Sequence, residues 1–384
     1  VYKNTGTVKL KVSGEEYEFT SFRSDKYVRG LHTPAKIYFT DDMELDARRR
    51  DFTCNAVYFD IKGEKFIDPL GGIEDIKNKR VRTVAAAEKV FGEDGLRLMR
   101  LARLCGSVGF SPDEECLQGA KANAGLIRDI SAERIYAELC GILHADEKYG
   151  IEYGQYAALC VLRDSGVLAY ILPELALGAC MSQRADFHLY DVLEHSLRCA
   201  MYAPSDIRLA ALLHDAGKPY CKITTGNFHG HEEEGARIVS EICTRLKVPK
   251  KLTEETVRLT ALHMYDCAGN TRESKIRRII SSNHDIFFKL LELKQADYSA
   301  CRGDLSAAPS VTKWTEIYKK MTEEGVPFSL RELKVKGNEL IAEGIPHKKC
   351  GKVLEKLLSE CAVLPVLNEK SKLISAAKRI AATI

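Results

Sequence analysis

The sequence predicts an α+β fold, with a partial β-sheet head at its start and an extended all-helical body after it. Within residues 1–84, polar residues alternate with β-branched or aromatic ones, and Gly, Pro and Ser separate these runs. From residue 85 onward, apolar residues recur at helical spacing. The 384 residues suffice for two or three domains. We expect a head (1–84), a helical neck (85–180), a histidine-rich helical body (181–305) and a helical tail (306–384).

Composition limits the classes of function. The net charge is only +3, so binding to nucleic acid would require local basic patches. Thirteen cysteines occur without a CxxC pair, which argues against a disulfide framework or a zinc ribbon and favours a reducing, cytoplasmic compartment. No apolar run approaches membrane-spanning length, and no segment resembles a signal peptide.

The head is predicted to be built from short strands. TGTVKLKVSG and EEYEFTSFR alternate around Ser13-Gly14, which predicts a hairpin. SDKYVRGLHTPAK is rich in turn-forming and basic residues, and we interpret it as a mobile loop. IYFT, AVYFD and KFI predict further strands, and DPLGG predicts a tight turn into a helix. The basic triplet at residues 48–50 is, on its own, typical of a solvated turn.

The stretch EDGLRLMRLAR (Glu93 to Arg103) predicts a helix with two different faces. An apolar stripe is spaced for burial and comprises Leu98, Leu101, Ala102 and Cys105. A charged ridge recurs every three residues, so that each member follows the last by about one turn; it comprises Asp94, Arg97, Arg100 and Arg103. The plain interpretation of this ridge is a solvated face held by an Asp94–Arg97 ion pair.

The other interpretation of the ridge is a reader of bases and phosphates. Cytosine and adenine both place an amino donor beside a ring-nitrogen acceptor on their pairing edge. A carboxylate can accept from the amino group while an arginine donates to the ring nitrogen. Guanine and uracil present the opposite order. The next two arginines could then hold a triphosphate.

Four motifs in order carry a family resemblance: RRDFTCNA (Arg49 to Ala56), DPLGGIEDI (Asp68 to Ile76), EDGLRLMRLAR, and SAERIYAEL (Ser131 to Leu139). Together they resemble successive motifs of the class II tRNA nucleotidyltransferases, the CCA-adding enzymes and their poly(A) polymerase relatives. The resemblance covers essentially the whole chain. It implies a nucleotidyltransferase head, a helical neck and binding of tRNA, CTP and ATP.

The resemblance also implies roles for individual residues. Arg50 would contact the incoming nucleotide, Asp94 and Arg97 would pair with the base, and Arg100 and Arg103 would help to bind the nucleotide. The remaining motif positions would act as hinge or structural residues: Asp51, Asn55, Asp68, Gly72, Asp75, Glu133 and Arg134. SFRSDKYVRGLHTPAKIYFT is similar to the flexible loop associated with the switch from CTP to ATP, which favours full CCA addition over CC addition.

One motif of the family has no counterpart in this sequence. The family's Gly-Gly-x-x-Arg-Asp turn, followed by two aspartates one residue apart, would hold two Mg²⁺ ions that activate the attacking 3′-hydroxyl and neutralise pyrophosphate. Asp41-Asp42 is adjacent rather than alternate. Because the chain starts at Val1 within strand-like sequence, we expect it to be truncated at its N-terminus and inactive in polymerisation as it stands.

The neck is predicted to be helical. Ser131 is placed to cap a helix that carries Glu133 and Arg134, which we interpret as structural residues that clamp the nucleotide-reading helix. The stretch from Tyr153 to Leu172 has helical periodicity and should end at Pro173.

Six of the ten histidines lie between His188 and His263. LAALLHDAGKP places His214 and Asp215 in an apolar helix that Gly217 and Pro219 should close. A His-Asp pair with another histidine upstream and an aspartate downstream suits a divalent metal. The pattern resembles the HD phosphohydrolase superfamily. The resemblance implies metal ligands, of unknown metal, at His195, His214, Asp215 and Asp297, with His231 and His263 available for a second metal or for contact with phosphate. The alternative is a degenerate, structural HD fold.

The tail is predicted to be helical, with breaks at Gly344 and Pro346. Lys348, Lys349 and Lys352 could contact tRNA phosphates, an attraction that salt would weaken. An ordinary solvated helix start is equally compatible with this pattern.

The sequence therefore favours a CCA-adding tRNA nucleotidyltransferase with an HD domain. Three alternatives stay open: a poly(A) polymerase of the same superfamily, a metal-dependent HD phosphohydrolase with an RNA-binding head, and a subunit whose missing strands come from a partner chain.

Overall fold

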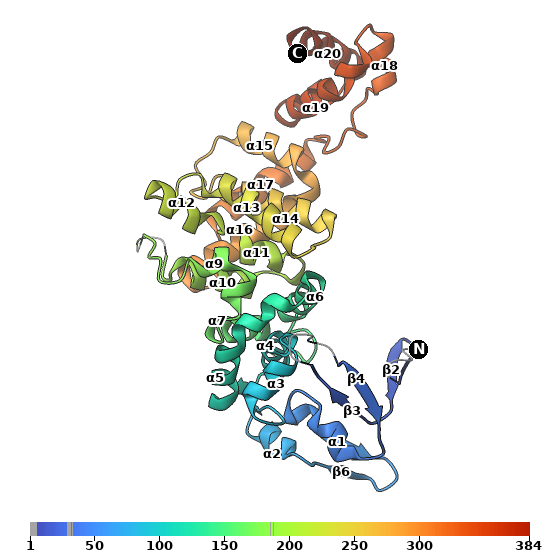
Figure 1. Ribbon diagram of the computed structural model, residues 1–384. Helices are drawn as coiled ribbons and strands as arrows, with labels where there is room; N and C mark the ends of the chain where they lie inside the picture. Colours follow the sequence, from blue (N-terminus) through green and yellow to red (C-terminus); the bar gives the residue numbers. More distant parts are fainter. Residues whose placement is uncertain (1–5, 29–31, 33, 185, 187) are drawn as a thin grey trace.

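A computed structural model of the chain describes residues 6–28, 32, 34–184, 186 and 188–384. The strands lie at one end, the helical neck and body follow, and the C-terminal helices form the other end (Figure 1). This arrangement confirms the predicted α+β fold with an elongated helical part. No helix within the described residues is long and apolar enough to cross a membrane. All thirteen cysteines are free thiols.

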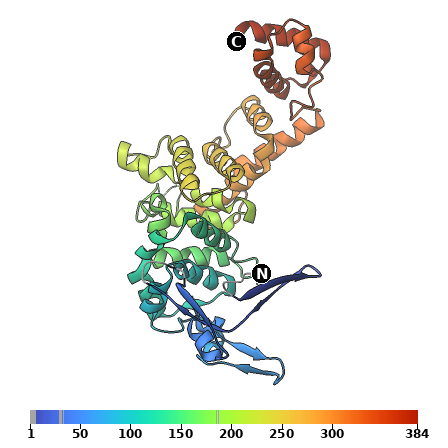
Figure 2. The ribbon, with the colours of Figure 1, turned by 45° about the vertical axis from the view of Figure 1, so that its right-hand side comes forward.

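The head consists of short strands and two short helices. Its elements are β1 (Thr7–Val12), β2 (Glu15–Thr20), β3 (Arg23–Lys26), β4 (Lys36–Phe39), α1 (Met43–Arg48), the 3₁₀ turn Thr53–Asn55, β5 (Tyr58–Asp60), β6 (Lys65–Ile67), α2 (Gly72–Lys77) and β7 (Arg80–Val81). β1 pairs antiparallel with β2, β3 with β4, and β5 with β6, so the strands form separate hairpins rather than one sheet. The β1–β2 hairpin projects away from the rest of the molecule (Figure 2).

Of two predictions for the head, the structure confirms one and contradicts part of the other. The hairpin around Ser13-Gly14 is confirmed, and Gly14 takes the left-handed conformation, with a φ of +91°, that such a turn demands. The interpretation of SDKYVRGLHTPAK as a loop is wrong at both ends, because Ser24–Lys26 belong to β3 and Lys36 belongs to β4, with which β3 pairs. Residues 29–31 and 33 of that segment, like Val1, lie outside the described residues.

The neck contains the stretch EDGLRLMRLAR. Its elements are α3 (Ala87–Glu93), α4 (Leu96–Val108), β8 (Ser111–Pro112), α5 (Glu114–Asn123), the 3₁₀ segment Ala124–Asp129, α6 (Ala132–Leu143), α7 (Gly154–Asp164), α8 (Leu168–Ile171) and α9 (Pro173–Ala176). The predicted apolar stripe of α4 is confirmed, since Leu98, Leu101, Ala102 and Cys105 are all fully buried. The single helix predicted before Pro173 is instead two, α7 and α8, because Gly166 between them adopts a φ of +74°.

The body is all helical. Its elements are α10 (Val192–Tyr202), the 3₁₀ turn Ser205–Ile207, α11 (Arg208–Leu213), α12 (Gly217–Thr225), α13 (His231–Arg245), α14 (Lys250–Leu262), α15 (Glu273–Ser282), the 3₁₀ turn His284–Ile286, α16 (Phe287–Arg302) and α17 (Pro309–Glu323). Neck and body share one hydrophobic core, whose members begin at Phe52 of the head and end at Ala362 of α19 (His347–Val363). The guanidinium of Arg208 joins them further through both oxygens of Asp146, at 2.6 and 2.7 Å, and through the carbonyl of Leu143.

The tail has a core of its own. Its elements are α18 (Gly337–Ala342), α19 (His347–Val363), the 3₁₀ turn Pro365–Leu367 and α20 (Lys370–Thr383). Their apolar side chains form a second cluster that begins at Leu333 and ends at Ile380. Trp314 and Met321 of α17 belong instead to the larger core. The expected boundary at residues 305/306 therefore precedes a helix that packs with the body.

Candidate functional sites

The charged ridge on α4 differs from its prediction at its first residue. Asp94 is not helical: α3 ends at Glu93, Asp94 is extended with a φ of −146°, and α4 begins at Leu96. Its Oδ1 accepts a hydrogen bond from the Leu96 amide at 3.0 Å, which satisfies one of the free N–H groups at the start of α4. Its Oδ2 accepts from Arg134 of α6 at 3.1 Å, so the simple Asp94–Arg97 pair does not form.

Arg97 is the most enclosed member of the ridge, with only 5% of its surface exposed. Its Nη1 donates to the carbonyl of Val90 at 3.0 Å and to Glu93 at 2.9 Å. Its Nη2 donates to the carbonyl of Arg49 at 2.9 Å and to the hydroxyl of Tyr27 at 3.2 Å. Arg97 therefore joins α3, α4 and two segments of the head, and the solvated-face interpretation does not hold for it.

Asp51 and Arg100 form a pair at the boundary between head and neck. Arg100 donates from Nε and Nη2 to Asp51 Oδ2, at 2.8 and 2.6 Å, and the Asn55 amide donates to Asp51 Oδ1 at 3.0 Å. Burial by itself would raise the pKa of the Asp51 carboxyl. The charge of Arg100 and the hydrogen bonds from Asn55, Arg100 and Phe52 outweigh burial, and they hold this pKa below its usual range.

Arg50 and Arg103 are tethered but partly exposed. Arg50 donates to Asp46 and to the carbonyl of Asn55, and its side chain is 30% exposed. Arg103 donates to Glu138 of α6 at 2.7 Å, and its side chain is 37% exposed. Both guanidiniums thus keep donor surface that an anionic ligand could reach.

A pocket of about 430 Å³ opens beside the ridge. Its polar wall comprises Asp51, Asn55, Arg100, Arg103, Ser107, Lys148 and Tyr149. The three cationic side chains among them give this wall the character of an anion-binding surface. Lys148 and Tyr149 carried no sequence signal, because they lie in the connection between α6 and α7, more than forty residues from the ridge.

The DPLGGIEDI motif has a structural explanation in this fold. Asp68 caps α2 by accepting from the amides of Gly72 and Ile73 at 2.8 and 2.9 Å. Gly72 lies so close to the 3₁₀ turn Thr53–Asn55 that a Cβ there would come within 2.2 Å of the Thr53 carbonyl. Asp75 is buried and accepts from the Thr53 hydroxyl and from two arginines, Arg80 and Arg82. The motif thus holds the RRD segment in place.

The second site lies in the body, where the ends of several helices converge. His195 projects from α10, His231 is the first residue of α13, His263 follows α14 and Asp297 lies on α16. His214 and Asp215 do not lie in a helix as expected, because α11 ends at Leu213 and α12 begins at Gly217. A Cβ at Gly217 would lie 2.2 Å from the His231 carbonyl, so glycine lets the His214–Asp215 turn approach α13.

The six predicted ligands form one contiguous cluster around Asp215. On one side, His195 Nε2 lies 3.4 Å and His214 Nε2 3.3 Å from Asp215 Oδ2, and His195 Nε2 lies 3.1 Å from Asp297 Oδ1. On the other side, the Nε2 atoms of His231 and His263 lie 3.3 and 3.5 Å from Asp215 Oδ1. The Asp215 carboxylate thus lies between two groups of ligands.

Hydrogen bonds to the backbone fix the orientation of three of the histidine rings. The Nδ1 atoms of His214, His231 and His263 each lie 2.6–2.8 Å from the carbonyl oxygen three residues earlier, an arrangement in which Nδ1–H donates. In the neutral rings Nε2 is then a bare acceptor directed at carboxylate oxygens, which are acceptors as well. Acceptors that face one another at such distances require protons or a cation between them.

The charge of the cluster favours a cation. Burial would lower the pKa of His214, but Asp215 and Asp297 raise it well above its usual value. The pKa values of both aspartates are held well below their usual range, against the effect of burial, chiefly by the neighbouring histidines. Two ligand atoms about 2.1 Å from one ion and at tetrahedral angles are about 3.4 Å apart, and the distances in this cluster match. The residues therefore fit a divalent metal.

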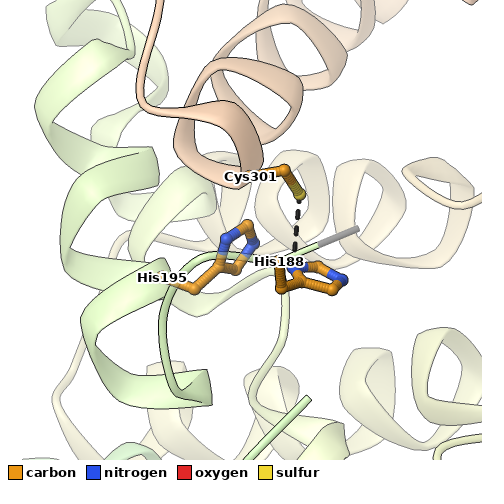
Figure 3. A group of neighbouring side chains, drawn as sticks. All are labelled: His188, His195 and Cys301. Carbon is orange, nitrogen blue, oxygen red and sulfur yellow. Dashed lines mark hydrogen bonds between the residues drawn. The ribbon is translucent and has the colours of Figure 1, made fainter. Parts of the chain in front are cut away.

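Three further residues border this cluster and were not among the expected ligands. Lys218 is buried, and its Nζ lies 2.6 Å from Asp215 Oδ2. His188 and Cys301 lie beside His195 (Figure 3). The spacing of Cys301, four residues after Asp297 on α16, is a signal that the sequence does contain. His229, by contrast, is exposed and donates its amide to Asn227.

The predicted basic residues of the tail lie in the first turns of α19. Lys348 and Lys352 are exposed, whereas Lys349 is half-buried and donates to the carbonyl of Ala381 at 3.1 Å. Lys348 and Lys352 are thus the two of the three that are exposed.

Family models match three parts of the chain. Residues 2–82 match the "Poly A polymerase head domain", residues 109–177 the "Probable RNA and SrmB- binding site of polymerase A", and residues 186–297 the "HD domain".

Curated relatives are similar over longer stretches. An A-adding tRNA nucleotidyltransferase of Deinococcus radiodurans is 33% identical over 284 residues, which cover 69% of this chain and 62% of that protein. A Multifunctional CCA protein of Xanthomonas campestris is 33% identical over 66% of this chain and 62% of its own length. A CCA-adding enzyme of a Geobacillus strain is 38% identical over 43% of this chain and 39% of its own length. The chain thus spans less than two thirds of these relatives.

Among solved structures, the Bacillus stearothermophilus CCA-adding enzyme in complex with CTP aligns with all of this chain and 83% of its own, with a TM-score of 0.68 and 24% identity. The Thermotoga maritima CCA-adding enzyme complexed with tRNA aligns with 99% of this chain and 80% of its own, with a TM-score of 0.51 and 16% identity. At these identities the alignments support the fold alone.

Proposed function

Because a polymerase head model, a polymerase RNA-binding model and curated tRNA nucleotidyltransferases match this chain, we propose that it selects and positions CTP and ATP for addition of CCA to the 3′ end of tRNA. The observation that carries this proposal is the α4 ridge. A carboxylate, Asp94, and a guanidinium, Arg97, stand together at its start, and two more arginines line the adjoining pocket.

Base selection would use the two residues at the start of the ridge. Asp94 Oδ2 would exchange its bond with Arg134 for the amino group of cytosine or adenine. Arg97 would exchange its bond with the Tyr27 hydroxyl for the ring nitrogen, while its bonds to the Val90 and Arg49 carbonyls hold it in place. Uracil and guanine would place a carbonyl oxygen opposite the Asp94 carboxylate. Because both groups are acceptors, these bases would be rejected.

Phosphate binding would use the pocket. Arg100 and Arg103 of the pocket wall would supply donors to the triphosphate. Arg50, which does not line the pocket but donates to the carbonyl of the pocket residue Asn55, would supply further donors from beside it. Glu133 and Arg134 lie on α6, where Arg134 already contacts Asp94. The carboxylate pair that would hold two Mg²⁺ ions has no counterpart among the residues of this chain, so we assign these residues binding and selection and no step of the transfer itself.

The test of this proposal is the Asp94→Ala variant. Loss of a charge-assisted hydrogen bond is worth about 1.5–3 kcal/mol, or about 10- to 150-fold. We expect the preference for CTP and ATP over UTP and GTP, measured by competitive binding, to fall by that factor while tRNA affinity is kept. Asp113→Ala is the matched control, because Asp113 likewise accepts a backbone amide at the start of its helix, here from Cys116 in α5. Equal loss of nucleotide preference and tRNA affinity would contradict the assignment.

The product distinguishes related activities. One relative is named an A-adding enzyme, and a poly(A) polymerase is a further alternative. These three activities can be distinguished by the nucleotides added to a tRNA that ends before CCA. CCA addition stops after three nucleotides and A addition after one, whereas polyadenylation continues.

A second activity is favoured by the buried cluster in the body, where two aspartates and four histidines converge. We propose that this cluster binds a divalent metal. A bound divalent metal would activate water against a phosphate ester such as a 2′,3′-cyclic phosphate. We expect phosphate-ester hydrolysis to be lost in His214→Ala and kept in His229→Ala, whose side chain is exposed. Equal rates in these two variants would contradict a hydrolytic role.

A further inference from the structure

The pocket beside the ridge has an apolar wall that binding of a triphosphate leaves unused. The side of α4 that lines the pocket carries Arg100 and Arg103 first and then Leu104 and Val108. Apolar side chains from the head and from the segment after α4 complete this wall: Phe52, Cys54, Ile76 and Phe110. A triphosphate satisfies the arginines, but an apolar wall is stabilised only when an apolar group covers it.

The base of the incoming nucleotide is not the group that covers this wall. Neither Asp94 nor Arg97, which would read that base, is among the described residues that line the pocket. The Arg97 guanidinium is directed instead at the Tyr27 hydroxyl and the Arg49 carbonyl. The base would therefore lie on that side of the ridge, while its phosphates reach the arginines of the pocket. The apolar wall is left for a second planar group.

Lys148 and Tyr149 border the pocket from the connection between α6 and α7. The Lys148 ammonium lies 4.9 Å from the centroid of the Tyr149 ring, and Tyr149 is 60% exposed. A ring that is so exposed offers a surface on which a nucleobase can stack, and the ammonium beside it attracts a phosphate. The pair thus combines the two contacts that a nucleotide of an RNA strand requires.

The connection that carries this pair is fixed at both ends. Arg208 of α11 donates to both oxygens of Asp146, at 2.6 and 2.7 Å, and the Ile151 amide donates to the Asp146 carbonyl at 3.1 Å. Ile151 also packs at the end of α4, where a Cβ on Gly109 would lie 3.2 Å from its Cγ2. The lysine and the tyrosine lie between these two anchors, so the stacking surface is in place before a ligand arrives.

We propose that the apolar wall, Tyr149 and Lys148 hold the last nucleotide of the tRNA 3′ end, with its base stacked on Tyr149 and its phosphate beside Lys148. This inference rests on the proposed binding of CTP and ATP by the ridge. Because transfer joins the 3′-oxygen of the last tRNA nucleotide to the α-phosphorus of the incoming one, the two nucleotides must be neighbours. Stacking requires only a flat ring, so this site would accept a last base that changes with each addition.

The test compares the affinities of the full chain for two forms of one tRNA, one that ends before CCA and one that is shorter by its last, unpaired nucleotide. Their ratio isolates the last nucleotide, because all other contacts are common to both forms. Stacking of one base should make this ratio about 5- to 150-fold in the unaltered protein and in Tyr149→Phe, which keeps the ring. In Tyr149→Ala the ratio should fall to about 1.

Tyr170→Ala is the matched control. Tyr170 of α8 is 37% exposed, the Arg128 guanidinium lies 4.5 Å from the centroid of its ring, and it is not among the described residues that line the pocket. This variant should keep the ratio of the unaltered protein. Lys148→Gln should reduce the slope of log affinity against log salt concentration by about 0.7 for the longer tRNA, because one phosphate contact is lost.

A ratio of about 1 in the unaltered protein overturns the site for the last nucleotide. A ratio that Tyr149→Ala keeps, or that Tyr149→Ala and Tyr170→Ala lose equally, overturns the role of Tyr149. Failure of the proposed function is visible separately, in competition between CTP and UTP without tRNA. Equal binding of CTP and UTP by the unaltered protein would overturn the reading of the base by the ridge, and this inference with it.

Discussion

Replacement of Arg97 by methionine tests whether this residue is structural as well as nucleotide-binding. The change keeps an unbranched chain of similar reach but removes every donor. Two carbonyl oxygens, of Val90 and Arg49, lose their Arg97 donor in a region where Arg97 is only 5% exposed. At about 1–3 kcal/mol for each carbonyl left unpaired, the variant should lose about 2–6 kcal/mol of unfolding free energy.

Arg103→Met is the control for Arg97→Met, because it removes the same group from the same helix. Within the described residues Arg103 donates only to Glu138, and its side chain is 37% exposed, so its loss should cost about 0–1 kcal/mol. Urea unfolding followed by the fluorescence of Trp314, the single tryptophan, reports on the core that neck and body share. Equal midpoints and slopes for the two variants would refute the structural role of Arg97.

The other two predictions concern acid stability and salt. Because the pKa of Asp51 is lowered on folding, its contribution to stability is present above its ordinary pKa of about 3.9 and is lost as the pH falls through the folded value. Arg100→Met removes the main charge that opposes burial, so acid unfolding followed by circular dichroism should begin at a higher pH than in Arg103→Met; an unchanged acid midpoint would contradict this account. Replacement of Lys348 and Lys352 by glutamine should reduce the slope of log tRNA affinity against log salt concentration by about 0.7–0.9 per lysine. An unchanged slope would mean that α19 does not touch tRNA.

Local patterns were the most predictable part of this fold. The β1–β2 hairpin followed from alternation around Ser13-Gly14, and the buried stripe of α4 followed from helical spacing. Both depend on residues within a few positions of one another. Failures arose where a side chain competes with the helix for the backbone: Asp94 takes the Leu96 amide and stays extended, although its spacing suits a helical ridge.

The sequence allowed us to predict which residue types make up the candidate sites, but not which residues contact one another. The burial of Arg97 depends on Tyr27 and Arg49, which lie 70 and 48 residues away and whose approach no periodicity encodes. His188 and Cys301 are 113 residues apart, so their proximity appears only once α16 lies against the segment before α10. The DPLGGIEDI motif carried a family signal, while its physical role emerged from the contact between Gly72 and Thr53.

The hydrogen bonds that hold His214, His231 and His263 have a consequence for metal loading. Each joins a ring to the carbonyl three residues earlier, so the direction of each lone pair is a property of one short stretch of chain. The rotational entropy of these three rings is therefore lost during folding rather than at the moment of binding. An incoming ion would meet a preorganised set of donors, and its affinity would depend on displacing protons from the cluster rather than on reshaping the protein.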